Sequence, residues 1–244
     1  MSGHVKRRRR WIIAAGLVGA FVAGTVARRA TQRRGVPSNA SADVAFMRAL
    51  HSALRRDLSR LEAVANRGIA GPAPATVLAG WDAFRQELDN HHTAEDEDLW
   101  PLLRSKLSDP ADLAEVDAMV EEHRRIPDAL IKVDTALRGD GDLLVPARDL
   151  STVVRDHLEH EEREVLPLIE RNLTRAEWRK FLVTERGRRP AKERPQFLTW
   201  ILDNATEQDA AAVLTELPPP ARVVYRRVLR PRYNRQHRWH FQAA

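Results

Sequence analysis

The feature that most constrains the fold of this chain is a motif that occurs twice, 66 residues apart. HHTAEDEDLWP occupies residues 91–101, and HLEHEEREVLP occupies residues 157–167. Aligned on their prolines, His91 matches His157 and Glu95 matches Glu161. A spacing of four residues places each histidine and its glutamate one turn apart on the same face of a helix.

The face that carries each pair is otherwise apolar. At helical spacing the first pair is part of the stripe Phe84, Leu88, His91, Glu95, Leu99, Leu102. The second pair is part of the stripe Leu150, Val154, His157, Glu161, Val165, Leu168. We therefore expect both pairs to face a core, where a carboxylate and an imidazole are unfavourable unless something compensates them.

Two further histidines interrupt apolar stripes in the same way. The stripe around His51 contains Val44, Met47, Leu54, Leu58 and Leu61. The stripe around His123 contains Val116, Met119, Ile126, Leu130 and Val133. The two stripes match position by position, so the sequence predicts a twofold pseudo-repeat in which every helix directs a ligand-type residue inward.

These patterns predict an all-α fold. Helices are expected over about residues 44–66, 75–107, 110–138 and 146–173, with Asp109 as a cap and Pro110 as the first helical residue of the third. Amphipathic helices joined by short loops predict an up-down-up-down four-helix bundle. We expect three parts: residues 1–36, the bundle at 37–173, and a C-terminal appendage at 174–244. The appendage opens with a capping box at 174–177, has a linker at 187–195 and continues as two or three short helices.

The charge is segregated along the chain. The net charge of +6 divides into +9 for residues 1–36, −11 for 37–173 and +8 for 174–244. Basic residues flank the uncharged run of residues 11–27, whose 17 residues would form a helix roughly 26 Å long. We expect a single-pass membrane anchor here; a cleaved or twin-arginine signal and a soluble apolar helix are the alternatives. Five basic residues before the run and four after it do not select the side of the membrane.

The C-terminal end interleaves basic and aromatic residues. Seven arginines from Arg222 to Arg238 alternate with Tyr225, Tyr233 and Trp239. We expect this segment to fold back on the acidic bundle and bury its rings. An anionic membrane surface is the first alternative. Nucleic acid is not expected, because no nucleic-acid-binding fold signature accompanies the arginines.

Together the inward-facing polar residues predict a metal site. The chain has no cysteine, which excludes thiolate ligands. Imidazole and carboxylate suit iron, zinc or copper, and a set of this size fits two metal ions. A ferritin-like site is not expected, since it needs Glu-x-x-His on two helices. The predicted ligands are His51, His91, Glu95, His123, His157 and Glu161.

Two other histidines are expected mainly at the surface. His92 shares a face with Asp96, Arg85 and Arg104. His160 shares a face with Glu164. Either histidine could still support a ligand from outside the site.

The order of the six residues resembles the hemerythrin-like family of HHE cation-binding domains. The resemblance covers about residues 44–173 and fills all six motif positions. It implies a four-helix bundle with two non-haem iron ions, joined by an oxo or hydroxo bridge and by both glutamates. It also implies binding of dioxygen or a related small ligand. One position departs from the oxygen carriers: the residue one turn after His123 is Pro127 rather than a second histidine.

We therefore expect a di-iron protein that binds or reacts with dioxygen, hydrogen peroxide or nitric oxide. Pro127 favours sensing or detoxification over reversible oxygen carriage. A non-catalytic iron- or oxygen-responsive interaction module is the alternative, and a redox-silent zinc protein is a third hypothesis. Nothing in the sequence is typical of a hydrolase or transferase site.

Overall fold

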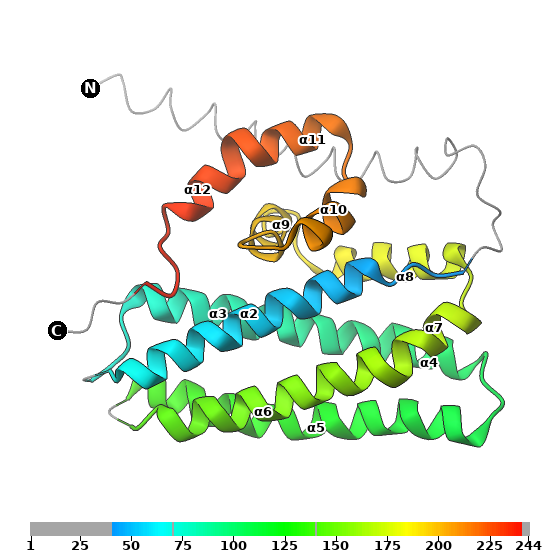
Figure 1. The fold of residues 1–244 in the computed structure, drawn as a ribbon, viewed down its shortest axis with the longest axis horizontal. Helices are drawn as coiled ribbons and strands as arrows, with labels where there is room; N and C mark the ends of the chain where they lie inside the picture. The colour runs from blue at the N-terminus through cyan, green and yellow to red at the C-terminus, as the bar shows by residue number, and fades with distance from the viewer. Residues whose placement is uncertain (1–40, 70, 140, 241–244) are drawn as a thin grey trace.

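A computed structural model describes residues 41–69, 71–139 and 141–240 of the chain (Figure 1). These residues are all-helical and contain no strand, which confirms the predicted fold class at this level. Four long helical segments lie side by side (Figure 1), as expected for a helical bundle.

The four segments begin and end close to the predicted bounds. They are α2 (Ala45–Arg67), α3 (Ala75–Ala94) with its continuation to Arg104, α5 (Pro110–Arg138), and α6 (Leu144–His160) with its continuation to Asn172. The predicted cap is confirmed, since the Asp109 side chain accepts a hydrogen bond from the Ala111 backbone N–H. Burial of the apolar stripes forms one core, in which Leu54, Leu58, Phe84, Met119 and Val154 are at most 1% exposed.

Two of the four segments contain a π-helical turn immediately before a proline. The first, η1 (Glu95–Leu99), connects α3 to α4 (Trp100–Arg104), and the second, η2 (Glu161–Val165), connects α6 to α7 (Leu166–Asn172). In each case the backbone N–H just before the proline donates to a carbonyl five residues earlier, that of Glu95 or Glu161. Because the ring of Pro101 or Pro167 clashes with the carbonyl four residues before it, the helix widens there by one residue.

The widened turn shifts the apolar stripe. Leu102 was expected in the core, but it is only partly buried, and Leu103 is fully buried instead. The prediction failed because it assumed an unbroken period of 3.6 residues, whereas a π turn contains one extra residue. In the second half, both Leu168 and Ile169 are buried.

The C-terminal residues fold back on the bundle. They form α8 (Arg175–Arg188), α9 (Arg194–Ile201), α10 (Glu207–Thr215), α11 (Pro219–Val224), η3 (Tyr225–Leu229) and α12 (Arg230–Asn234). The predicted capping box is confirmed between Thr174 and Glu177. α8 contacts α3, and α9 and α10 contact α2, so these helices cover one side of the bundle (Figure 1).

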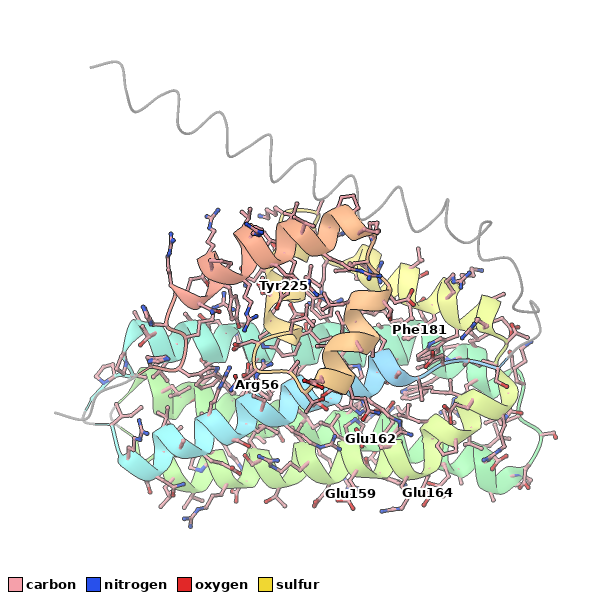
Figure 2. The ribbon with its side chains drawn as sticks, turned by 45° about the horizontal axis from the view of Figure 1, so that its top comes forward. Arg56, Glu159, Glu162, Glu164, Phe181 and Tyr225 are labelled. Atoms are coloured by element: carbon pink, nitrogen blue, oxygen red, sulfur yellow. The ribbon has the colours of Figure 1, made fainter. Side chains whose placement is uncertain are left out.

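Buried hydrogen bonds attach the C-terminal helices to α2. Asp57 of α2 accepts a hydrogen bond of 2.7 Å from Trp200 Nε1, and Arg56 donates to the carbonyls of Trp200 and Asp203 (Figure 2). The rings of Tyr225, Tyr233 and Trp239 are buried. The expectation that the tail folds back with its rings inside is therefore confirmed.

The expected membrane localisation is not supported by the described helices. In the described part of the chain, no helix has both the length and the apolar character needed to cross a membrane. Residues 11–27, on which the expectation depended, lie outside the described residues.

Trp239 anchors the end of the described chain to α3. Its backbone N–H donates to the Thr76 carbonyl over 2.9 Å. Its ring lies against Gly80, where an added Cβ would come within 2.5 Å of ring atoms. Trp239 has a φ of 64°, a left-handed conformation that is unfavourable for a bulky side chain and that the anchored ring and backbone maintain.

Gly80→Ala should release this anchor, because the new methyl group and the Trp239 ring cannot occupy the same space. We expect a lower melting temperature and faster proteolysis after residue 230. Gly187→Ala is the matched control, since a Cβ there meets nothing within 4 Å and should stabilise α8 by about 0.5–1 kcal/mol. If both substitutions stabilise the protein equally, Trp239 does not depend on Gly80.

Candidate metal centre

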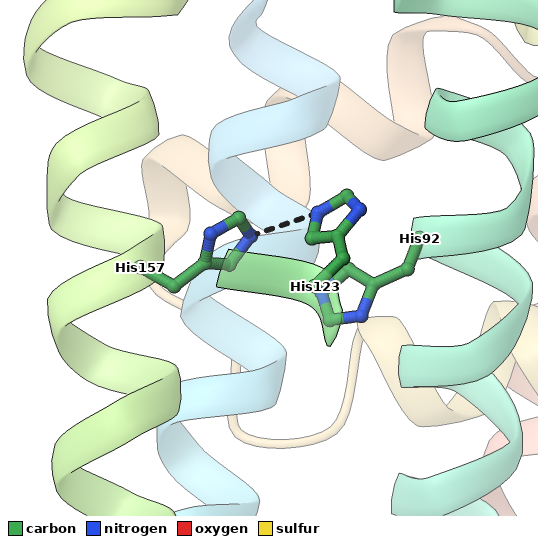
Figure 3. Close-up of side chains that lie close together, drawn as sticks. All are labelled: His92, His123 and His157. Atoms are coloured by element: carbon green, nitrogen blue, oxygen red, sulfur yellow. Dashed lines mark hydrogen bonds between the residues drawn. The ribbon is translucent and has the colours of Figure 1, made fainter. Parts of the chain in front are cut away.

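The structure brings all six predicted ligand residues together inside the bundle. Together with His92, they form two groups, and within each group the candidate ligand atoms lie within 4.8 Å of one another. The first group is His51, His91, Glu95 and Glu161. The second group is His92, His123 and His157 (Figure 3).

Glu95 lies between the two groups. Its Oε1 is 3.2 Å from His91 Nδ1 in the first group, and its Oε2 is 3.5 Å from His123 Nε2 in the second. Glu161 Oε2 is 3.1 Å from His51 Nε2. Both glutamates are the first residues of π turns, so the widened helices determine where the two carboxylates enter the core.

The polar atoms at this centre lack ordinary hydrogen-bond partners. Among the described residues, the buried side-chain atoms without a partner include all four carboxylate oxygens of Glu95 and Glu161. They also include Nε2 of His51, His91 and His92. Burying such atoms unpaired costs about 1–3 kcal/mol each, so their concentration at one place indicates that they bind something else. Nitrogen and oxygen donors of these types fit a first-row metal ion.

The outward nitrogens, in contrast, are hydrogen-bonded to carboxylates from outside the centre. The three pairs have distances of 2.8–2.9 Å: His51 Nδ1 with Glu162, His123 Nδ1 with Asp96, and His157 Nδ1 with Glu122. This pattern orients metal-binding histidines in proteins, because the carboxylate fixes the ring and leaves the other nitrogen facing the metal. Here it leaves Nε2 of all three rings facing inward.

His160 contacts one of these outer carboxylates, Glu122. Its Nδ1 lies 2.7 Å from Glu122, the partner of His157, and its Nε2 lies 2.9 Å from Glu115. Burial would lower the pKa of His160, but the two carboxylates outweigh it and raise the pKa. The residue is half-buried rather than fully at the surface, and it acts on His157 only through Glu122.

Electrostatics at the inner atoms favour a bound cation. Burial and the neighbouring imidazoles lower the pKa of His91 and His92 well below the ordinary value, so both rings are neutral and can donate a lone pair. Burial and the nearby Glu161 raise the pKa of Glu95 well above the ordinary value. Two buried carboxylates side by side repel each other, and a cation between them would remove that repulsion.

The pKa values of the outer carboxylates Glu162 and Glu122 shift in the opposite direction, downward. Burial would raise the pKa of Glu162, but hydrogen bonds from His51 and Arg55 outweigh it and hold the pKa at about 2. Burial would also raise the pKa of Glu122, which hydrogen bonds from His157 and His160 lower. Both groups are therefore charged at neutral pH and accept the outward N–H of their histidines.

His92 is the residue whose role the sequence interpretation missed. It was expected on a solvated face, but its ring stacks on the His123 ring with centroids 4.1 Å apart (Figure 3). Asp96, placed on the same face, is exposed as expected and in addition accepts a hydrogen bond from His123. The repeat itself contained the signal: His92 aligns with Leu158, a residue with 0% exposure, so this position faces inward in both halves.

Two arginines at the end of α8 form ion pairs with the stretch of chain that carries His91 and Glu95. Arg189, 1% exposed, donates to Glu87 over 2.7 Å, one turn before His91. Arg188 donates over 2.6 Å to both Glu97 and Asp98, just after Glu95. We call Arg188 and Arg189 the arginine clamp, because together they fix α3 and η1 on both sides of the ligand pair.

Comparison with known proteins identifies the bundle. The family model of the hemerythrin HHE cation-binding domain matches residues 42–169, slightly more than half of the 244-residue chain. The chain belongs to this hemerythrin family. Neither the comparison with curated proteins nor that with solved structures gives a match. The hemerythrin match ends before α8, so the arginine clamp lies outside the part of the chain that defines the family.

Arg188→Ala should weaken metal binding by up to about 10-fold, the low end of the effect of losing a direct partner of a metal ligand, because Arg188 acts on Glu95 only through the neighbouring Glu97 and Asp98. Competition with a chromophoric chelator for Co²⁺ would measure it. Arg138→Ala is the matched control, because Arg138 also joins two helices through two carboxylates, Asp82 and Asp134, with no contact to the centre. Equal affinity in the two variants would show that the clamp does not act on the ligands.

Proposed function

We propose that this protein is a non-haem di-iron protein of the hemerythrin type that binds or reacts with dioxygen, hydrogen peroxide or nitric oxide. The observation that carries the proposal is the set of unpaired buried donor atoms, divided into two adjacent groups. The family match adds that such domains bind cations. We include in the proposal that the bundle has the up-down-up-down connection typical of four-helix metal proteins.

Each group would hold one ion. His51 and His91 would bind the first, and His92, His123 and His157 the second. Glu95, which contacts both groups, supports a bridging role for this carboxylate, and we assign the same role to Glu161 because it occupies the equivalent π-turn position. Iron held in this way would supply redox chemistry and exchangeable coordination positions for a small ligand.

The protein's own side chains would set the conditions of that chemistry. The six predicted ligands are at most 6% exposed, which excludes bulk water and large substrates. The outer carboxylates Glu162, Asp96 and Glu122 hold the imidazoles in one orientation. The arrangement therefore suits a small ligand such as dioxygen, hydrogen peroxide or nitric oxide.

His92 modifies the expectation drawn from Pro127. Pro127 offers no ligand in α5 and is exposed. His92 of α3 instead places a third imidazole at the second group. We infer that each ion would be held by at least two histidines, so the second group does not lack imidazole ligands even though Pro127 replaces a histidine.

The non-catalytic alternative has one observation in its favour. The arginine clamp joins the C-terminal helices directly to the helix that carries His91 and Glu95. A change in metal occupancy would alter the position of that helix and could be transmitted to a partner. Turnover separates the two functions, since an enzyme consumes excess peroxide whereas a sensor responds stoichiometrically.

The full-length chain, expressed with iron, tests the proposal. We expect about two irons per chain, absorption in the near ultraviolet and visible, and loss of both in the Glu95→Gln, Glu161→Gln double variant. Glu207→Gln with Glu216→Gln, exposed residues at the start of α10 and just after its end, is the control for the charge change. Two colourless zinc ions per chain would support the zinc hypothesis, and a double variant that keeps two irons would refute the bridging role.

His92→Ala should selectively empty the second group, because it removes a ring that no other described residue replaces. We expect about one metal ion per chain, or a second ion bound at least about 10-fold more weakly. Metal analysis after gel filtration would measure it, with His237→Ala, an exposed and remote substitution, as control. Two ions bound with unchanged affinity would restore the original interpretation of His92 as a residue outside the site.

A further inference from the structure

The buried centre requires a route for its metal ions. The C-terminal helices cover the side of the bundle formed by α2 and α3, whereas α5 and α6 lie on the opposite, uncovered side (Figure 1). A path from solvent to His157 on the α5–α6 side would therefore not cross the C-terminal helices.

A cavity of about 460 Å³ opens to solvent at this place. Glu122 and Arg125 of α5 line one wall, and residues of α6 and η2 line the other: Val153, Asp156, His157, Glu159, His160 and Arg163. We call it the α5–α6 cavity. Its inner wall includes His157, which is 2% exposed and belongs to the second group of candidate ligands.

We propose that the α5–α6 cavity is the entrance through which a divalent metal ion passes from solvent to His157. This inference rests on the proposed function, because an entrance for metal needs a metal centre behind it. It adds to that function a role for residues that contact no inner donor atom of the centre.

The charges at the mouth of the cavity select a cation. Asp156 and Glu159 are exposed, lie one turn apart on the outer side of α6, and form no ion pair with any described residue (Figure 2 labels Glu159). The two arginines of the lining are each engaged by an acid, Arg125 by Glu121 and Arg163 by Glu164. The unpaired charge at the mouth is therefore negative, which raises the local concentration of cations.

Further metal-binding groups line the interior of the cavity. Glu122 stands between the mouth and the centre and lies 2.9 Å from His157 and 2.7 Å from His160. An ion that enters past Asp156 and Glu159 next meets the Glu122 carboxylate and then His157. Carboxylate oxygens and imidazole nitrogens are both ligands for first-row metal ions, so they can replace the water molecules of a hydrated ion one at a time.

Uptake kinetics test the entrance separately from the site. Metal-free full-length protein would be mixed with Co²⁺ in a stopped-flow spectrometer, and the visible absorption of the bound ion followed at low and high salt. Asp156→Asn with Glu159→Gln should slow uptake about tenfold at low salt, with less effect at high salt. The final Co²⁺ content should equal that of the wild type, because neither residue belongs to the centre.

Asp128→Asn with Asp149→Asn is the matched control. Both residues are exposed acids on the same two helices, form no ion pair with the described residues and lie outside the cavity lining. This pair removes the same charge and should leave the rate within about twofold of wild type. Equal slowing by the two pairs would mean that only the net charge matters and would overturn the proposal.

A second variant tests the space rather than the charge. Val153→Trp should fill part of the cavity and slow uptake at every salt concentration, whereas Val153→Ala should not slow it. Unchanged rates in Val153→Trp and in the acid pair would place the route elsewhere, for example beside the half-buried His92. If wild-type protein binds no Co²⁺, Zn²⁺ or iron at all, the proposed function fails, and the entrance fails with it.

Discussion

The structure depends on one costly arrangement: two carboxylates and several imidazole nitrogens are buried in a helical core without hydrogen-bond partners. Helices can bury apolar stripes at no such cost, so the polar atoms persist only if a bound group compensates them. The surrounding features follow from this requirement. Outer carboxylates orient the rings, π turns direct Glu95 and Glu161 inward, and packing excludes water.

Much of this was predictable because helical periodicity is regular. Each of His51, His91, His123 and His157 interrupts an apolar stripe, and an interruption at the same point of four stripes requires one shared interior site. The bounds of the helices followed from local signals such as Asp109 and the capping box at Thr174, since these depend on near neighbours in the sequence.

What the sequence did not reveal has specific causes. Leu102 was misplaced because the π turn changes the helical period just before it. His92 precedes that turn and was misplaced for another reason: it was assigned to a solvated face by its charged neighbours Arg85, Asp96 and Arg104. The prolines that accompany these turns were used to align the repeat, but not to anticipate a widened helix. The contacts of Arg188 and Arg189 are long-range, about 90–100 residues from their partners, so no local pattern predicts them. The expected membrane anchor found no support in the described helices.

The arginine clamp has a consequence for how the two parts of the chain communicate. If α8 must be docked for η1 to hold Glu95 in place, then docking and metal occupancy are linked equilibria. Linkage is reciprocal. If docking of α8 increases the affinity of the centre for metal by some factor, bound metal increases the affinity of α8 for the bundle by the same factor. A molecule that touched only the C-terminal helices would then alter the centre without approaching it, and would itself bind more tightly to one state of the centre than to the other.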